Sequence, residues 1–402
     1  MKQSWEIKTL LDVSVSIEDG DWIEKKDQST SGVRLIQTGN VGQGYYKDKG
    51  EKAKYISEDT FVRLKCTELT IGDILVSRLP DPVGRACILP ALGVRCITAV
   101  DCSIIKLKQD IIHPQWFVYY SLSSEYAAKV KKECSGTTRD RISRKKLSCI
   151  TIPVPPLAEQ ERIVEILDRE FEKIDALKAN AERNLQYAKD LLKQSQNTVY
   201  NNIETNPLDS MVTIINGYAF KSEDFSKTNP IKAVKITNVG VGIFIETIDT
   251  NLPQNLLLDK QDYTVHTGDI VFALTRTIIA AGLKVAIVPE TYNCALLNQR
   301  VAALRIDDDI QRKYLYNYFQ TATVKEYVLK KVNTLMQPNL SIKDLKAMPI
   351  PYCDRAEMEQ IVARLDKLKE NCQALEENYK KTIALCDDMK QALLRQAFNG
   401  EL

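Results

Sequence analysis

The sequence lacks the features of exported, disulfide-bonded and zinc-binding proteins. Its ten cysteines include no Cys-x-x-Cys pair, and there are only two histidines, His113 and His266. This usage is typical of a reducing cytoplasm, and a structural zinc site is not expected. No apolar run approaches the roughly 20 residues of a membrane span, and the first residues contain no apolar signal core. We therefore expect a cytoplasmic protein with no metal and no membrane segment.

Motifs of several large enzyme classes are also absent. The chain contains no Gly-x-x-x-x-Gly-Lys-Ser/Thr, no His-Glu-x-x-His and no Asp/Asn-Pro-Pro-aromatic sequence. The glycines of Gly39-x-x-Gly42-x-Gly44 have the wrong order for a dinucleotide loop and predict a turn. An acid/base pair among the 53 acidic residues stays open, because nothing singles one out. We expect no cofactor and no catalytic activity of the chain itself.

The sequence instead repeats itself at a spacing of about 198 residues. An Asn-Val-Gly-x-Gly turn begins at Asn40 and again at Asn238. Gly-Asp-Ile-Leu at 72–75 matches Gly-Asp-Ile-Val at 268–271, and segment 85–90 matches 284–289. A proline-rich segment and a long helical pattern then close each copy. Five matches in the same order indicate one module of about 200 residues written twice.

Each module predicts strands followed by helices. Apolar alternation predicts strands at 34–37 and 232–236, and apolar runs predict buried strands at 102–107 and 301–306. A helix is expected at 114–132 and its counterpart at 310–331. Pro153, Pro155 and Pro156 are expected to block helix and sheet alike, so that a longer helix begins only after them. The predicted fold class is α+β, with two repeated and mostly β domains that also contain helices.

Two long helices are expected within 156–202 and 353–402. No Gly or Pro lies between Glu159 and Thr198, so the first helix runs roughly 60 Å at ~1.5 Å per residue. The shared heptad rhythm favours a two-stranded coiled coil over two helices on separate cores. The predicted seam comprises Ile163, Leu167, Ile174, Leu177, Ala181, Ala188 and Leu191, and then Ile361, Leu365, Leu368, Cys372, Leu375, Tyr379, Cys386, Met389 and Leu393.

Basic charge is concentrated in one segment, although the formal net charge is only +2. Residues 129–146 contain eight Lys or Arg against two acidic residues, around a Ser-Gly-Thr-Thr-Arg turn. Such a run is often a solvated face, but on an expected loop it favours a nucleic-acid contact. The equivalent segment 333–339 has lost this charge. Its Asn and Gln amides either read adenine edges or serve as turn residues.

The candidate DNA-binding residues carry basic, hydroxyl, amide or aromatic side chains near expected turns. For any single arginine, a surface salt bridge is an equal alternative. The candidates are Tyr45, Tyr46, Lys47, Arg78, Arg85, Thr137, Thr138, Arg139, Arg141, Arg144, Lys145, Lys146, Arg276, Thr277, Asn298, Arg300, Asn333, Gln337 and Asn339.

Together these motifs resemble the specificity (S) subunit of type I restriction–modification enzymes, over essentially the whole length. The resemblance rests on the paired Gly-Asp motifs, on Ile-Pro-Val-Pro-Pro-Leu-x-Glu-Gln at 152–160, and on Leu-Leu-Arg-Gln-Ala-Phe-Asn-Gly-Glu-Leu at 393–402. The second copy departs from the pattern, since Pro351-Tyr352 lacks the second proline and Glu359-Gln360 falls two places late. Segment 197–200 is also a weak version of 395–398.

The resemblance implies two target-recognition domains, at 1–155 and 203–352, that each read half of a bipartite site in double-stranded DNA. Two spacer helices, at 156–202 and 353–402, would pack antiparallel and set the half-site separation. The implied partners are two methyltransferase (modification) subunits, joined in the full complex by ATP-dependent restriction/translocase subunits. Two alternatives stay open: a coiled-coil scaffold whose globular ends bind protein, and an enzyme with an unrecognised carboxylate site.

Overall fold

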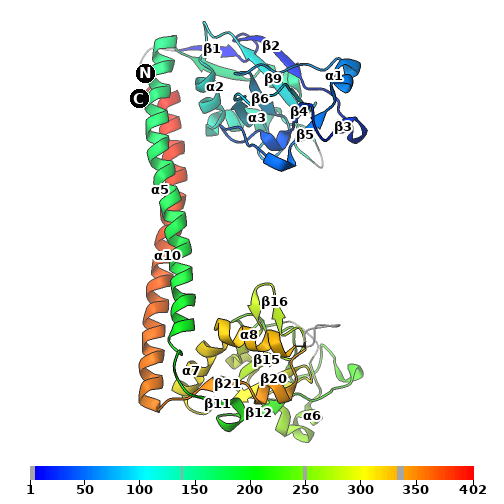
Figure 1. Cartoon of the computed structure of the whole chain (residues 1–402), viewed down its shortest axis with the longest axis vertical. Coiled ribbons are helices and arrows are strands. Elements are labelled where there is room, and N and C mark those ends of the chain that lie inside the picture. The colour runs from blue at the N-terminus through cyan, green and yellow to red at the C-terminus, as the bar shows by residue number, and fades with distance from the viewer. Residues whose placement is uncertain (1–4, 137–138, 248–250, 333–338) are drawn as a thin grey trace. The chain divides into compact units, whose positions relative to one another are not determined.

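The computed structural model describes residues 5–136, 139–247, 251–332 and 339–402. Contacts divide the chain into two compact units (Figure 1). Unit 1 comprises Met1–Glu182 and Lys380–Leu402, and unit 2 comprises Arg183–Tyr379. Each unit is an α+β domain that includes part of both long helices.

Unit 1 is built on a four-stranded antiparallel sheet of order β2-β9-β6-β7 and a mixed sheet of order β3-β5-β4-β8, in which β4 and β8 run parallel. Its strands are β1 (Glu6–Thr9), β2 (Ser14–Asp19), β3 (Gln28–Ser29), β4 (Val33–Ile36), β5 (Lys54–Ile56), β6 (Ile74–Ser77), β7 (Ala86–Ile88), β8 (Cys96–Thr98), β9 (Cys102–Leu107) and β10 (Thr151–Val154). Its α-helices are α1 (Glu58–Leu64), α2 (Pro114–Ser121), α3 (Ser124–Glu133), α4 (Arg144–Ser148), the first part of α5 (Leu157–Thr198) and the last part of α10 (Arg355–Phe398).

Unit 2 repeats this plan with sheets of order β12-β20-β15-β18 and β13-β19-β14, and adds a hairpin of β16 and β17. Its strands are β11 (Thr205–Pro207), β12 (Thr213–Asn216), β13 (Ala233–Val234), β14 (Thr264–Val265), β15 (Ile270–Ala273), β16 (Ile278–Ile279), β17 (Gly282–Leu283), β18 (Val285–Ile287), β19 (Ala295–Leu297), β20 (Val301–Arg305) and β21 (Pro349–Pro351). Its α-helices are the last part of α5, α6 (Gln254–Asp259), α7 (Asp309–Phe319), α8 (Ala322–Lys331), α9 (Ile342–Lys346) and the first part of α10.

The antiparallel sheet of unit 1 is buried on both faces, which explains its continuous apolar strands. Successive side chains of a strand point to opposite faces. Ile74 and Val76 accordingly pack with Trp116 of α2, whereas Leu75 packs with Ile36 of the second sheet. The sheet therefore lies between a helical layer and a second sheet.

The helices predicted at 114–132 and 310–331 are each broken in two. In unit 1, α2 ends at Ser121, and the hydroxyl of Ser123 accepts a hydrogen bond from the Tyr126 N–H to begin α3. In unit 2, Thr321 caps α8 through the Val324 N–H. A residue that caps a helix competes with continuation of the preceding one.

The proline segments form strands, contrary to the expectation that they would be neither helix nor sheet. Pro153 lies in β10, which pairs only with β1, and β21 pairs only with β11 among the described strands. In a two-stranded sheet, one side of each strand needs no ladder hydrogen bond, so a missing N–H is tolerated. The Pro153 carbonyl also accepts a hydrogen bond from the Trp116 indole, at 2.9 Å.

The two long helices run antiparallel within unit 1. Lys178 of α5 pairs with Asp387 of α10 at 2.6 Å, and Asp175 pairs with Lys390 at 2.5 Å. Advancing three residues on α5 therefore retreats three residues on α10. The side chains of Ile163, Leu167, Ile174, Ile361 and Leu365 are buried, and Leu368 is half-buried.

Four positions of the predicted seam are corrected, because their side chains are between 39% and 48% exposed: Leu177, Leu191, Leu375 and Met389. Beside Leu177, the seam passes instead through Lys178, the next residue. The Lys178 side chain is 28% exposed, and its amine reaches Asp387 on α10.

The Glu-Gln motif at the start of α5 anchors this helix to unit 1. Gln160 is fully buried, and its Oε1 accepts the His113 N–H at 2.8 Å. Its Nε2 donates to the carbonyls of Ile111 and Pro155, at 3.0 and 2.8 Å. The position 198 residues later holds the buried Met358 rather than Gln360, so unit 2 uses an apolar contact there. Among the described residues, no helix is both long enough and apolar enough to cross a membrane.

Candidate nucleic-acid interface

A buried asparagine shapes the glycine turn in each unit. The Oδ1 of Asn40 accepts the Gln37 N–H at 3.0 Å, and its Nδ2 donates to the Lys47 carbonyl at 3.0 Å. Asn238 makes the equivalent bonds to the Lys235 N–H and the Ile245 carbonyl, at 2.8 and 2.9 Å. The predicted repeat therefore extends to individual hydrogen bonds, and it presents an equivalent loop in both units.

The candidates on the first of these loops differ in exposure. Tyr45 is 58% exposed and Lys47 is exposed, so both side chains are accessible to a ligand. Tyr46 is half-buried, and burial raises the pKa of its hydroxyl to about 12. Tyr46 is therefore neutral at physiological pH.

Arg85 and Lys284 tie a second loop to the glycine turn. The Arg85 guanidinium donates to the carbonyls of Thr38 and Val41, at 2.7 and 2.6 Å, and also to two carbonyls of its own loop, 79–82. Lys284, at the equivalent place in unit 2, donates to the Ile236 carbonyl at 2.6 Å. Burial lowers the pKa of both side chains. Arg85 thus organises the loops in this structure, and a DNA contact from it stays a prediction.

Three of the arginines predicted to bind DNA form ion pairs with two carboxylates that the sequence analysis did not identify. Asp19 lies 3.3 Å from Arg78 and 3.7 Å from Arg144, and Asp101 lies 2.9 Å from Arg141. Arg78 is 5% exposed, its guanidinium also donates to the Val100 carbonyl, and burial lowers its pKa. Arg141 and Arg144 remain exposed at the surface.

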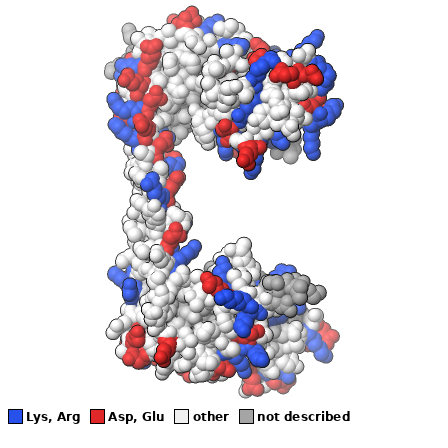
Figure 2. Space-filling view, viewed as in Figure 1, with Lys and Arg blue, Asp and Glu red and all other residues white. Residues whose placement is uncertain are grey.

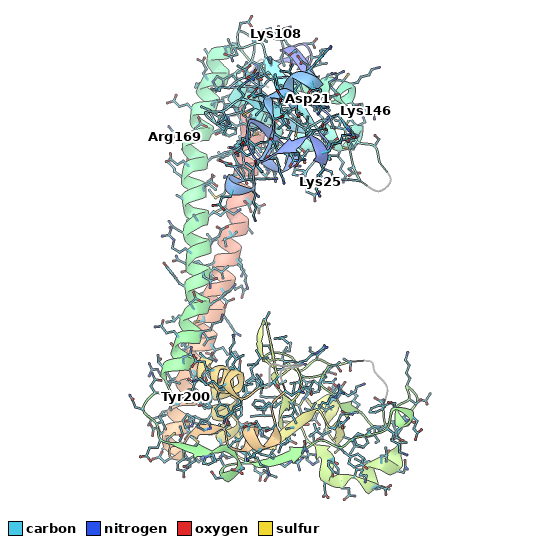
Figure 3. All side chains as sticks on the ribbon, turned by 45° about the vertical axis from the view of Figure 1, so that its right-hand side comes forward. Asp21, Lys25, Lys108, Lys146, Arg169 and Tyr200 are labelled. Atoms are coloured by element: carbon cyan, nitrogen blue, oxygen red, sulfur yellow. The ribbon has the colours of Figure 1, made fainter. Side chains whose placement is uncertain are left out.

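The basic segment 129–146 is helical at both ends. Its first residues belong to the end of α3, which falls within the helix predicted at 114–132, and its last residues form most of α4, where no helix was predicted. Lys129 pairs with Glu125 at 2.8 Å, and Lys146, labelled in Figure 3, donates to the Glu133 carbonyl at 2.9 Å. Four exposed basic residues have no ion pair within 4.0 Å among the described residues: Lys131, Lys132, Arg139 and Lys145. Thr137 and Thr138 lie outside the described residues.

A cavity of about 720 Å³ lies beside this segment, between the turn at 80–83 and α3. Its lining combines apolar side chains, including Pro82, Val83 and Val130, with the charged residues Asp81, Lys131, Arg139 and Asp140. The backbone N–H of Ile142 donates to the Arg78 carbonyl at 3.3 Å. The structure therefore brings the turn at 78–85 and the basic segment together.

The corresponding surface of unit 2 is differently composed. Arg276 and Arg300 are exposed, Asn298 is half-buried, and Thr277 is buried with its hydroxyl unpartnered among the described residues. Asn339 is exposed and forms a β-bridge with Thr275, next to Arg276. Asn333 and Gln337 lie outside the described residues.

The hairpin β16–β17 is an element of unit 2 that the sequence analysis missed. It follows Arg276, and Leu283 anchors its base in the core at 6% exposure. Its tip presents Ile279, 45% exposed, together with the exposed Ala280 and Ala281. The loop between the two strands is Ala280-Ala281, which is none of the dipeptides typical of a two-residue hairpin turn, so the sequence carries no clear signal for this element.

On the face shown in Figure 2, Lys and Arg are interspersed with Asp and Glu in both units. Charge alone therefore does not outline an interface. The candidate interface is defined by three neighbouring segments in unit 1, the glycine turn, the 78–85 turn and the basic segment, and by their counterparts in unit 2. No group of three or more His, Cys, Asp or Glu side chains in the described ranges is arranged to hold a metal ion.

Comparison with known protein families gives two matches along the chain. The family described as type I restriction modification DNA specificity domain matches residues 2–186 and again 200–385. The specificity subunit of the type I restriction enzyme MjaVIII of Methanocaldococcus jannaschii is 28% identical over 284 residues, which cover 66% of each chain. The EcoKI specificity subunit of Escherichia coli strain K12 is 22% identical over 339 residues, which cover 77% of this chain and 70% of that subunit.

Solved structures share the fold over the full length. A chain from a study of complex assembly and conformational transition of the type I R-M system aligns with a TM-score of 0.77 at 17% identity, covering 100% of this chain and 99% of that one. The HsdS subunit of Thermoanaerobacter tengcongensis aligns with a TM-score of 0.64 at 17% identity, covering 100% and 98%.

Proposed function

The chain belongs to the type I restriction modification DNA specificity family, and on that premise we propose that it is the DNA-reading subunit of a modification complex, without an active site of its own. In this proposal each unit reads one half of a bipartite site in double-stranded DNA. Its ten cysteines are free thiols, which suits a cytoplasmic location.

The observation that supports this proposal is that both units fold the same loops but differ in the side chains at equivalent positions of these loops. Asn40 and Asn238 fold equivalent turns, and Arg85 and Lys284 brace them in equivalent ways. At the same time Arg141 of unit 1 is replaced by Asn339 in unit 2, and Asp101 by Arg300. Base contacts specify a sequence, whereas phosphate contacts position the protein. Two units with the same frame and different contact residues would therefore read two different half-sites.

A domain exchange tests this proposal. Residues 1–155 would be replaced by the first recognition domain of another family member, and methylated bases would be mapped after co-expression with modification subunits. We expect one half of the methylated sequence to change and the other half to persist. A change in both halves, or in neither, would contradict independent reading by the two units.

We also propose that the long helices bind the modification subunits. On the described parts of α5 and α10, each unit carries three exposed large apolar side chains: Leu177, Leu385 and Met389 in unit 1, and Leu375, Tyr187 and Leu191 in unit 2. Each member of one set lies 198 residues from a member of the other. Repeated apolar surface on an otherwise charged helix is typical of a protein contact. Two like surfaces favour two copies of one partner, and restriction/translocase subunits would join through these.

Replacement of these side chains tests the docking proposal. The variant Leu177→Ser/Leu385→Ser/Met389→Ser should retain one modification subunit rather than two, as measured by native mass spectrometry of the purified complex. The matching change in unit 2 should have the same effect, and the two together should abolish assembly. Full assembly of the combined variant would contradict the proposed surface.

A further inference from the structure

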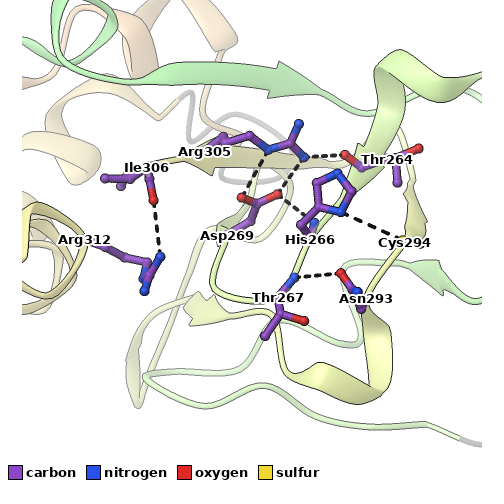
Figure 4. A network of polar contacts seen from close by, with 9 residues as sticks. All are labelled: Thr264, His266, Thr267, Asp269, Asn293, Cys294, Arg305, Ile306 and Arg312. Atoms are coloured by element: carbon purple, nitrogen blue, oxygen red, sulfur yellow. Dashed lines mark hydrogen bonds and ion pairs between the residues drawn. The ribbon is translucent and has the colours of Figure 1, made fainter. Parts of the chain in front are cut away.

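The structure places an exposed thiol against an imidazole in unit 2. The Sγ of Cys294 lies 3.9 Å from the Nδ1 of His266, and both residues are exposed (Figure 4). A thiol in contact with an imidazole can transfer its proton to it, and the resulting thiolate is the nucleophilic form of cysteine. The pair lies outside the segments of the candidate nucleic-acid interface.

Strand pairing produces this contact. In the ladder of β14 and β19, Thr264 faces Leu296 and Val265 faces Ala295. His266 and Cys294 are the next facing positions, immediately beyond the ladder. Side chains of directly facing residues lie close enough to interact. The register that builds the sheet therefore also brings the thiol and the imidazole together.

Hydrogen bonds on the loop beyond the ladder fix the pair further. The Thr267 N–H donates to the Asn293 side-chain carbonyl at 3.2 Å, and the Thr267 hydroxyl donates to Glu290 at 2.9 Å. The His266 backbone N–H donates to Asp269 at 2.9 Å, and Asp269 is itself held by Arg305 at 2.9 Å. Figure 4 shows these bonds on both sides of the pair, apart from the one to Glu290. His266 and Cys294 are thus held in place by their neighbours on both strands.

The other cysteines are differently placed. Seven are buried and Cys134 is half-buried, whereas only Cys149 shares the exposure of Cys294. Burial raises the pKa of several of the buried thiols, as for Cys66, where it rises to about 11, and Cys87, where it rises to about 12. Those thiols are protonated and shielded at neutral pH. Cys149 has no histidine contact among the described residues, which makes it a control within the same molecule.

We propose that Cys294 and His266 form a reactive-thiol site that is oxidised by small hydroperoxides to a sulfenic acid. His266 accepts the thiol proton, and the thiolate sulfur attacks one oxygen of the peroxide. The S–O bond forms as the O–O bond breaks, so that sulfur loses two electrons and the peroxide gains them. The departing oxygen takes the proton from the imidazolium and leaves as water or an alcohol.

Competitive labelling of the full-length protein tests this site. The protein is treated with limiting hydrogen peroxide and dimedone, and adducts at each cysteine are quantified by peptide mass spectrometry. We expect labelling of Cys294 to be faster than that of Cys149 by about a hundredfold or more, which is the lower end of the range for a positioned base. In His266→Gln, labelling of Cys294 should fall to the rate of Cys149, while Cys149 itself is unchanged.

Equal rates for Cys294 and Cys149 in the natural sequence would overturn the proposal, as would an unchanged rate in His266→Gln. Circular dichroism of the variant checks that it is folded, and His266→Asn provides a second variant if the first is not. A parallel measurement with iodoacetamide separates nucleophilicity from peroxide chemistry. Faster alkylation without faster sulfenic acid formation would contradict the hydroperoxide step.

Discussion

Phe398, near the end of the chain, packs edge-to-face against Trp116 of the first domain, with ring centroids 4.7 Å apart. It makes the same kind of contact with Tyr120, at 5.0 Å. In unit 2, Tyr200 packs edge-to-face on Tyr314 and Tyr318, at 5.2 and 5.1 Å. Phe398 is the last residue of α10, and Tyr200 follows the end of α5 by two residues. An aromatic side chain at the end of each long helix thus enters the core of a unit; Tyr200 is labelled in Figure 3.

Removing this ring should weaken unit 1. Phe398 is 7% exposed, and large-to-small changes of buried aromatic residues typically cost about 3–5 kcal/mol. We expect Phe398→Ala to lower the free energy of unfolding by that amount in urea denaturation monitored by tryptophan fluorescence. Leu385→Ala, at an exposed position of the same helix, should change it by less than about 0.5 kcal/mol. Equal effects of the two changes would contradict the packing role of Phe398.

The buried amide of Gln160 should be required for the junction of α5 with unit 1. Gln160→Ala would leave the His113 N–H and two carbonyls without their partner, and unsatisfied buried groups cost about 1–3 kcal/mol each. We expect a clear loss of thermal stability by calorimetry. Gln186→Ala, on the exposed part of α5, is the matched control and should be nearly neutral. A neutral Gln160→Ala would show that water replaces the amide.

The exposed lysines of the basic segment should bind DNA phosphates. We expect Lys131→Gln/Lys132→Gln/Lys145→Gln to weaken binding of the assembled complex to all DNA sequences alike. The slope of log K against log salt should decrease in magnitude by about 0.9 for each phosphate that is no longer neutralised. Lys108→Gln, on a different part of unit 1 in Figure 3, should leave the slope unchanged. An unchanged slope in the triple variant would favour the protein-scaffold alternative.

The uncharged tip of the β16–β17 hairpin should contact thymine methyl groups. A two-stranded ribbon fits the major groove, where alanine and other apolar side chains meet the methyl of thymine. Replacing thymine by deoxyuridine in the half-site read by unit 2 should weaken binding about fourfold per contacted methyl, or about 0.8 kcal/mol. The variant Ile279→Ser should remove this discrimination. No effect of uracil in that half-site would exclude the contact.

Asp21, labelled in Figure 3, should make stability depend on pH. Burial raises the pKa of its carboxyl, although hydrogen bonds from the Thr67 N–H and from Cys66 oppose the shift. A raised folded-state pKa favours the protonated form, so its stabilising contribution is present at low pH and is lost as pH rises through that pKa. We expect Asp21→Asn to raise Tm at pH 7. This gain should shrink when the pH falls below the pKa that the Asp21 carboxyl has in the unfolded chain. A gain that does not change with pH would contradict this origin.

The repeat, the fold class and the long helices could be predicted because each depends on patterns of residues that are close together in the sequence. The seam could not be placed throughout. An apolar residue was expected at Leu177, whereas in the structure Lys178 is the less exposed of the two and pairs with Asp387 of α10. The breaks in the helices at 114–132 and 310–331 depend on caps at Ser123 and Thr321 that resemble ordinary helix residues.

The candidate interface was harder to predict, because its organisation depends on partners distant in sequence. In the sequence, Arg78 and Arg141 are indistinguishable as candidates for DNA contact. In the structure, Arg78 pairs with Asp19 and Arg141 pairs with Asp101. Arg85 is equally basic, but its guanidinium already donates hydrogen bonds to backbone carbonyls of two turns. Sequence patterns identify which residue types are available, and tertiary contacts decide which of them remain free for a ligand.

The division of unit 1 between the two ends of the chain has a consequence for biosynthesis. Unit 2 is one continuous segment, whereas unit 1 needs residues 380–402 for its core. On the ribosome, unit 2 can complete its core while the earlier-made domain still exposes the surface that Phe398 will cover. The first domain to emerge is therefore the last to be finished, and during that interval it is the part most exposed to chaperones and proteases.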